Sequence, residues 1–133
     1  MADTPIPTVW PATRFDDAHA AIKFLIDAFG FEETLVVEED GVIHHAELRW
    51  PLGGGVMLGS ANRKDSVLSA LPTGAASVYA VTDEPDALFV RATAAGATVV
   101  RGLRDEDYGS RGFTVRDPEG NFWSFGTYRG AAS

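Results

Sequence analysis

The chain has 133 residues, of which 45% are apolar and 11% aromatic, enough to build the core of a single domain. Its 19 acidic and 11 basic side chains give a formal charge of -8, which disfavours binding to nucleic acid or to an anionic membrane surface. Cysteine is absent, which excludes disulfides, thiolate nucleophiles and thiolate metal sites.

The N-terminal stretch Met-Ala-Asp-Thr-Pro-Ile-Pro has no basic region and no apolar segment of signal length. Nowhere do about 18 apolar residues follow one another, as a membrane-spanning helix requires. We therefore expect a cytoplasmic protein with no membrane partner.

The first half of the chain predicts one strand, one helix and three more strands. The helix begins at the N-cap acid Asp17, shows apolar residues at helical spacing as far as Phe29, and stops at Gly30. The strands are expected at residues 6–15, 31–39, 42–50 and 55–60. The three glycines at 53–55 are followed by neither a helix nor a lysine, so they predict a hairpin turn, not a phosphate-binding loop.

The second half predicts the same order of elements after a polar linker at 61–74. A helix is expected at residues 84–95, with a proline in its first turn, where a missing N–H costs nothing. The strands are expected at 75–82, 97–102, 111–117 and 121–127. The turn Pro118-Glu-Gly-Asn separates the last two strands.

The two halves are versions of one sequence. Residues 46–60 align with residues 113–127 at a constant offset of 67, and the two helices align at an offset of 66. The identical pairs are Arg49 with Arg116, Pro51 with Pro118, Gly53 with Gly120, and Gly59 with Gly126.

Neither half can bury both faces of its strands alone. We therefore predict a single α+β domain at residues 1–133, with tandem βαβββ modules at about 6–60 and 75–128. The modules are expected to form one curved mixed sheet, with helices on its outer face and a concave cleft on the other.

Strand alternation sorts the side chains between these two faces. The residues expected on the helix side are Ala46, Leu48, Phe113, Val115, Trp123 and Phe125. Those expected in the cleft are Thr8, Trp10, Ala12, His45, Glu47, Arg49, Gly55, Met57, Gly59, Ser77, Tyr79, Val81, Gly112, Thr114, Arg116, Phe122, Ser124 and Gly126.

His45 and Glu47 are the candidate polar pair of the cleft. They could orient a ligand, act as a general base and its partner, or form a displaced metal site. The alternative is an ordinary polar pair near a strand end, paired with Arg49. His44 is expected to point to the helix side or the rim, and His19 to be structural.

Four side chains, Trp10, Met57, Tyr79 and Phe122, predict a soft, aromatic-lined cleft that suits a flat or apolar ligand. A pocket filled by these same side chains is the alternative. The polar loop at 105–111 adds Tyr108 and Arg111 near the mouth. Its acids could meet a cationic ligand, or the loop is a turn with solvated charges.

The residues that close the repeat resemble those of a known family. The tandem βαβββ pattern from Ile6 to Tyr128, with the stretch Gly109-Ser-Arg-Gly-Phe-Thr-Val-Arg-Asp-Pro-Glu-Gly-Asn-Phe-Trp-Ser-Phe near its end, is similar to the vicinal oxygen chelate superfamily. That superfamily includes glyoxalase I, extradiol dioxygenases, fosfomycin-resistance enzymes and bleomycin-resistance proteins. The resemblance concerns the fold more than the activity.

The resemblance also implies where a metal would be held. Metal-dependent members carry histidine or glutamate at one inward position on the first and last strand of each module. The matching positions here are Trp10, Met57, Ser77 and Ser124, and neither an indole nor a thioether can replace an imidazole or carboxylate ligand. No metal or other cofactor is therefore expected, and no catalytic residue is assigned.

Three functions remain open at this point. The first is a metal-free homodimer, similar to bleomycin-resistance proteins, whose clefts bind an aromatic or cationic organic molecule, for example in antibiotic sequestration. The second is a metal-dependent or acid–base lyase or isomerase of the glyoxalase type. The third is a partner protein with a collapsed cleft. The sequence does not identify the ligand, nor whether the modules pair within or between chains.

Overall fold

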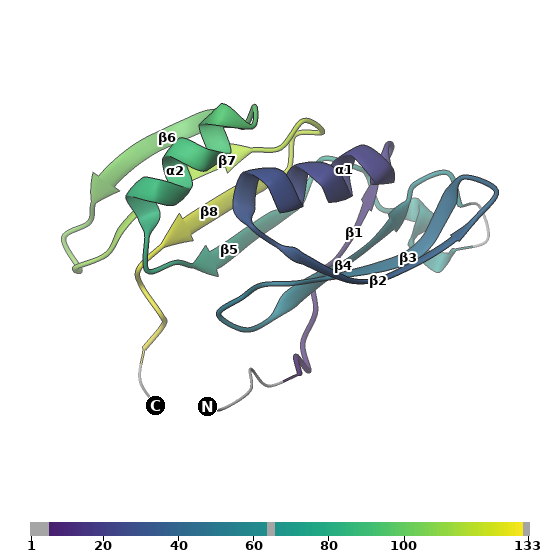
Figure 1. Cartoon of the computed structure of the whole chain (residues 1–133), viewed down its shortest axis with the longest axis horizontal. Helices are drawn as coiled ribbons and strands as arrows, with labels where there is room; N and C mark the ends of the chain where they lie inside the picture. Colours follow the sequence, from purple (N-terminus) through teal and green to yellow (C-terminus); the bar gives the residue numbers. More distant parts are fainter. Residues whose placement is uncertain (1–5, 64–65, 132–133) are drawn as a thin grey trace.

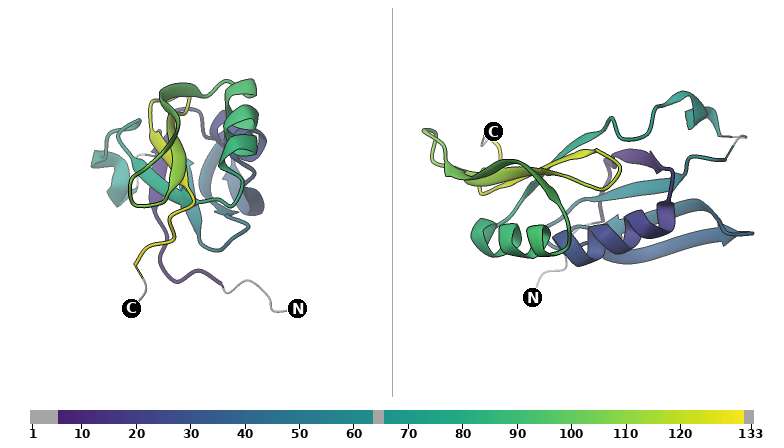
Figure 2. Two further views of the ribbon diagram at one scale, coloured as in Figure 1. Left: turned by 90° about the vertical axis from the view of Figure 1, so that its left-hand side faces the viewer. Right: turned by 90° about the horizontal axis from the view of Figure 1, so that it is seen from above.

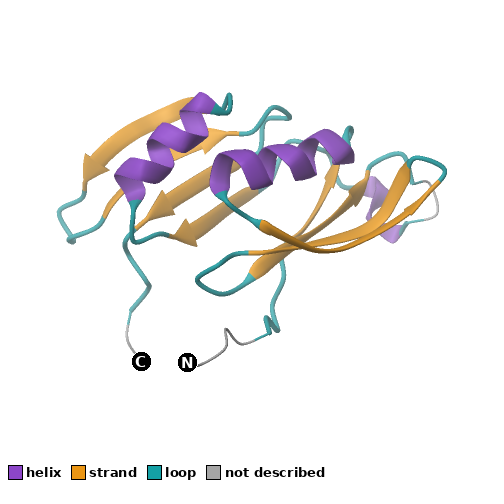
Figure 3. Ribbon diagram, in the orientation of Figure 1, coloured by secondary structure: helices purple, strands orange, loops and turns teal. Residues whose placement is uncertain are grey.

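The computed structural model describes residues 6–63 and 66–131 and has the predicted tandem βαβββ order (Figures 1 and 3). The first module contains β1 (Ala12–Phe15), α1 (Ala18–Phe24), the π-helical turn η1 (Leu25–Phe29), β2 (Glu32–Glu39), β3 (Val42–Arg49) and β4 (Gly55–Ser60). A short 3-10 helix, η2 (Val67–Ala70), follows. The second module contains β5 (Ser77–Val81), α2 (Pro85–Ala94), β6 (Thr98–Asp105), β7 (Arg111–Arg116) and β8 (Phe122–Gly126). The predicted α+β class is confirmed.

The strands form two four-stranded mixed sheets, where a single continuous sheet was expected. The first sheet has the order β1-β4-β3-β2, and the second has the corresponding order β5-β8-β7-β6. In each sheet the first and last strands of the module pair in parallel and the other pairs are antiparallel. Each module thus completes its own sheet, and the modules join through side chains.

The first strand is shorter than predicted. Residues 6–11 lie outside β1, and two of them, Pro7 and Pro11, have no N–H to donate to a neighbouring strand. The chain still runs beside β4, because Met57 N donates to Pro11 O at 2.9 Å. In the second module, β6 is longer than predicted, because it continues past Gly102 as far as Asp105. Its pairing with β7 contains two register shifts.

The expected helix 17–29 begins as α-helix and ends as π-helix. Asp17 caps its start by accepting a hydrogen bond from Ala20 N at 3.0 Å, as N-cap acids do. Gly30 ends it with a φ of 88°, a left-handed conformation that glycine adopts without strain. None of the helices in the described part of the chain has the length and apolar character of a membrane-spanning helix.

Each helix lies over the sheet of its own module, and the first helix meets α2 at its π-helical end, η1 (Figure 2). All six residues predicted for the helix side are buried: Ala46, Leu48, Phe113, Val115, Trp123 and Phe125. Aromatic rings join the modules, since Phe29 and Phe31 of the first module contact Trp123 of the second, with ring centroids 5.4 and 5.7 Å apart. The modules therefore share one core, and neither is an independent layer.

The turn after β7 is fixed by a buried carboxylate. Asp117 accepts hydrogen bonds from the backbone N–H groups of Glu119 and Asn121, from the Asn121 side chain, and from the indole N–H of Trp123 at 2.9 Å. The Glu119 carboxylate in turn accepts from the N–H groups of Asp16 and Asp17 at the start of α1. The second-module turn thereby holds the first helix in place.

Candidate ligand-binding site

Each sheet has one face in the core and one open face. The repeat pairs the open-face positions at the same offset of 67, because Ala12 lies beside Met57 in the first sheet and Tyr79 lies beside Ser124 in the second. The side chains proposed as ligand contacts fall into two groups. His45, Glu47 and Met57 belong to the first sheet, with Trp10 beside it, and Ser77, Tyr79, Phe122 and Ser124 belong to the second. No strand pairing joins the two open faces among the described residues.

The open face of the first sheet carries a histidine–carboxylate pair. His45 Nε2 lies 2.7 Å from Glu47 Oε2, and both side chains are half-buried. Met57 is the strand partner of Glu47 on β4. The Trp10 ring lies against Gly55 on β4, and its N–H donates to Pro7 O at 3.1 Å. This arrangement combines a polar pair with a thioether and an indole on one surface.

His44 lines one cavity with His45, which counts against the helix side as its position, one of the two alternatives predicted for it. The pairing of β2 with β3 shifts between Val37 and Glu38, which leaves His44 as an extra residue on β3. Because of this bulge, the buried core positions Ile43 and Ala46 are three residues apart, and both histidines line one cavity on the open face. A β-bulge re-aims side chains in this way.

The open face of the second sheet is mainly aromatic. Tyr79 on β5 and Phe122 on β8 are 49% and 38% exposed. Arg116 lies over the Phe122 ring, 5.0 Å from its centroid, a cation–π contact. Ser124 Oγ lies 2.8 Å from Thr114 Oγ1. Ser77 is the strand partner of Phe122.

Two further tyrosines extend this aromatic surface. Tyr108 contacts Tyr128 edge to face, with ring centroids 5.6 Å apart. The Tyr79 hydroxyl donates to Tyr128 O at 2.6 Å. Partial burial, followed by the charge of Tyr108, raises the pKa of Tyr79 above its usual value. Tyr79 is therefore a neutral hydrogen-bond donor and not a phenolate base at neutral pH.

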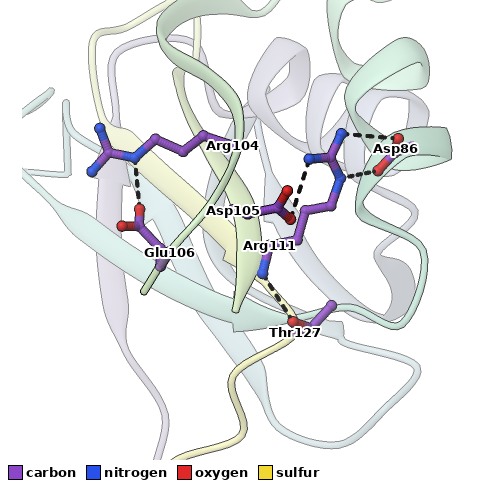
Figure 4. Close-up of polar contacts among 6 residues, drawn as sticks. All are labelled: Asp86, Arg104, Asp105, Glu106, Arg111 and Thr127. Atoms are coloured by element: carbon purple, nitrogen blue, oxygen red, sulfur yellow. Dashed lines mark hydrogen bonds and ion pairs between the residues drawn. The ribbon is translucent and has the colours of Figure 1, made fainter. Parts of the chain in front are cut away.

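Arg111 does not join this group, although we had expected it near the mouth of the cleft; its guanidinium turns to Asp86 and Asp105 (Figure 4). It shares the strand parity of the core residues Phe113 and Val115, and its guanidinium donates to both oxygens of Asp86 on α2, at 2.8 and 3.2 Å. A second ion pair joins Arg111 to Asp105 at 3.4 Å. Arg111 therefore ties β7 to the second helix.

Two of the three acids of the loop at 105–111, Asp105 and Glu106, are also engaged. Glu106 accepts a hydrogen bond from Arg104 at 2.7 Å, which lowers the pKa of the Glu106 carboxyl. Asp105 is paired with Arg111. This pattern fits the turn with paired charges better than it fits a free acidic surface.

The four positions that correspond to metal ligands do not fit a divalent ion. The strand partners of Met57 and Ser124 are Ala12 and Tyr79. Trp10 and Ser77 each lie two residues before these partners. Neither set supplies an imidazole or a carboxylate. Within residues 6–63 and 66–131 no three histidine, aspartate or glutamate side chains come together as metal ligands would.

Sequence reasoning missed Arg14 on the first sheet. Its position follows from the same alternation that places Ala12 on the open face, so the signal was present. The position of His44 could not be predicted in this way. A β-bulge reverses which residues of a strand face each side of the sheet, and no residue pattern in this strand indicates it.

These observations define a class of protein: two βαβββ modules with one shared core and two open sheet faces. A family model described as the Glyoxalase/Bleomycin resistance protein/Dioxygenase superfamily matches residues 9–125. The chain belongs to this superfamily.

Two mycobacterial relatives align with nearly the whole chain. An uncharacterized protein of Mycobacterium bovis is 36% identical over 132 residues, which cover 95% of this chain and 86% of that protein. An uncharacterized protein of Mycobacterium tuberculosis is also 36% identical, over 95% of this chain and 77% of that protein.

Solved structures agree with the fold. TioX from Micromonospora sp. ML1 has a TM-score of 0.76 and 31% identity, over 94% of this chain and 98% of TioX. A glyoxalase/bleomycin resistance protein/dioxygenase from Nocardioides has a TM-score of 0.67 and 20% identity, over 98% of this chain and 93% of that chain. The second likeness concerns the fold alone.

Proposed function

We propose that the protein is a metal-free, small-molecule binding protein of the bleomycin-resistance type, which holds an aromatic organic ligand on its open sheet faces. The observation that carries the proposal is the exposed aromatic surface formed by Tyr79, Tyr108, Phe122 and Tyr128. Aromatic side chains of this kind bind flat ligands by stacking, with little loss of side-chain entropy. The donor chemistry at the four metal-type positions supports the metal-free form.

We further propose that two copies bind the ligand together as a homodimer. The polar and aromatic faces lie on different sheets of one chain, and a two-fold partner can bring the first sheet of one copy to the second sheet of the other. Exposed apolar side chains on the edge strands, Leu35 and Val37 of β2 and Val99 and Val100 of β6, support a second copy. Sedimentation of a monomer at micromolar concentration would contradict the dimer.

Tryptophan fluorescence with proflavine, a flat aromatic cation, and with bleomycin tests the proposal. We expect saturable binding of at least one probe. The probe should protect the protein against heat by an amount that grows with its concentration, because it binds only the folded state. Native mass spectrometry of freshly purified protein should reveal a retained small molecule.

Matched variants separate the aromatic surface from general stickiness. Tyr79→Ala should weaken probe binding, while Val90→Ala, at an exposed apolar position of α2, should not. If both variants bind as the parent does, or if neither probe binds at all, the aromatic-surface proposal fails.

The contact between His45 and Glu47 favours a second candidate, an acid–base or metal-dependent enzyme of the glyoxalase type. Metal analysis and EDTA treatment distinguish it from the first. Under the binding proposal, EDTA leaves the melting temperature and the probe affinity unchanged, because EDTA removes no metal ion that stabilises the fold. A fall of several degrees that one divalent ion reverses, and that His45→Ala abolishes, would favour the enzyme.

A further inference from the structure

A cavity of about 240 Å³ lies at one end of the open face of the first sheet. It is bounded by β1, β3 and β4 and by the segment that follows β4. The ionisable side chains that line it are Arg14, His44, His45 and Arg63, and its described lining contains neither aspartate nor glutamate. The chain has a net charge of -8, so a cavity lined by basic side chains differs in charge from the protein as a whole.

Arg14 is the central group of this cavity. It lies on β1 beside Gly59 of β4, and only 7% of its surface is exposed. One guanidinium nitrogen, Nη2, donates to the carbonyl oxygens of Ser60, Ala61 and Arg63. The other, Nη1, is enclosed and has no hydrogen-bond partner in the part of the chain that the structure describes. Backbone carbonyl oxygens thus accept hydrogen bonds from Nη2, while Nη1 has no acceptor among the described residues.

Within residues 6–63 and 66–131, the charge of Arg14 has no counter-charge in an ion pair. None of the ion pairs found among the described residues includes Arg14. A buried charge without a counter-charge is costly, and buried arginines are ordinarily paired. Glu47, an acid on this face, contacts His45 Nε2.

Two more basic groups face the same space. The bulge in β3 turns His44 toward the cavity beside His45. Arg63, from the segment after β4, donates through Nη1 to His44 O at 3.0 Å and so holds the bulge and the segment together. Arg14 on β1, His44 on β3 and Arg63 after β4 thus line the same cavity from three different segments of the chain.

We propose that this cavity is an oxyanion subsite, which takes a carboxylate, phosphate or sulfate group. A guanidinium fork matches the geometry of such groups and forms strong, charge-assisted hydrogen bonds with them. The cavity is smaller than the roughly 300–1,000 Å³ of pockets that hold a whole organic ligand. It therefore accepts one charged group of a larger molecule, and Met57 and His45 connect it to the rest of the open face.

The subsite deepens the proposed function, on which its biological role rests. It predicts that the natural ligand carries an oxyanion at one end and an aromatic part at the other. The binding of a simple anion requires no aromatic surface, so the two proposals can fail separately.

The test compares sodium phosphate, sulfate and acetate with sodium chloride at matched ionic strength. We expect at least one oxyanion to raise the melting temperature above that in chloride, with saturation, and to bind in a calorimetric titration. The strongest of the three probes identifies the chemical class of the group. Phosphate binding can also be followed by broadening of its phosphorus resonance.

Variants then locate the anion. His44→Gln and Arg63→Gln should each lower oxyanion affinity by about tenfold, since each removes one charge-assisted contact. Arg14→Lys, which keeps the charge but removes the unpartnered nitrogen, should lower it at least as much. Arg104→Gln, at an exposed arginine on β6, is the matched control and should bind as the parent does.

The proposal is overturned if no oxyanion stabilises the parent protein beyond chloride, or if the folded His44→Gln and Arg63→Gln variants keep the parent affinity. These two variants decide the question even if Arg14→Lys does not fold. Retained oxyanion binding in Tyr79→Ala, which loses the aromatic probes, would support the subsite independently of the aromatic surface.

Discussion

The open faces of the two sheets occupy equivalent positions in the repeat and carry different chemistry. Arg14 corresponds to Val81, His45 to Gly112, Glu47 to Thr114 and Gly55 to Phe122. At the first three pairs an ionisable side chain of the first sheet corresponds to valine, glycine or threonine in the second, and at the fourth a glycine corresponds to phenylalanine. On the core side the same pairs of strands remain apolar, as at Leu48 and Val115.

This difference shows where a duplicated module is free to change. A core position must match its neighbours in volume, and the loss of even one methylene group is costly. A side chain on an open face touches fewer neighbours, so its type is constrained mainly by the ligand that binds there. Two copies of one module have therefore kept the core and become chemically distinct on the surface, which suits a ligand with two different ends.

The largest expected effect comes from the core beneath both faces. Trp123→Ala should lower the free energy of unfolding by about 3–5 kcal/mol, because Trp123 of the second module is 1% exposed and contacts two rings of the first module, Phe29 and Phe31. Urea unfolding measures the change. Phe122→Ala, one residue away on the open face, is the control, and a similar loss in both variants would contradict the assignment of faces.

A second change affects the turn of one module only. Asp117→Asn should cost about 2–3 kcal/mol, since an amide nitrogen cannot accept the hydrogen bonds that the carboxylate accepts from Asn121 and Trp123. The corresponding residue of the first module is Trp50, whose indole donates to Val81 O instead. Thermal unfolding measures the loss, and parent stability in Asp117→Asn would show that the buried carboxylate is dispensable.

Changes on the open faces should act on binding and not on folding. Trp10→Ala, beside the first sheet, and Phe122→Ala, on the second, should each weaken binding of an aromatic probe by about 1–3 kcal/mol. Calorimetry with proflavine or bleomycin measures the affinity. Parent affinity in the double variant would remove the aromatic faces from the site.

The smallest expected effect is electrostatic and lies outside both faces. The hydrogen bonds from Arg111 hold the pKa of the Asp86 carboxyl below its ordinary value of 3.8. A group with a lowered pKa contributes stability at pH values above its unfolded pKa, and this contribution is lost as the pH falls through the folded pKa. Asp86→Asn should therefore lower the melting temperature slightly at neutral pH, by an amount that vanishes in acid below that value.

Melting curves recorded from about pH 7 down to about pH 3 test this dependence. The exposed Asp107→Asn variant serves as the control. A difference between Asp86→Asn and the parent that grows toward acid would give the wrong sign for the ion pair.

The sequence by itself determined the modular order and the core. The repeat at an offset of 67, the glycine exits and the period-two patterns of β3, β4, β7 and β8 predicted the elements and the burial of Leu48, Val115 and Trp123. These features are local, so alternation and capping reveal them directly. The same alternation placed His45 and Glu47 on one face, and their contact follows from it.

Only the tertiary structure decided how the faces are assembled. The bulge that turns His44 into the cavity depends on how β3 pairs with β2, and the division into two sheets depends on which strand edges meet. The ion pair that keeps Arg111 on the helix side needs α2 to lie beside β7. Arg14 became a candidate because the chain after β4 folds over it and leaves no carboxylate among its described neighbours. Such contacts join residues far apart in sequence, and a pattern read along the chain does not contain them.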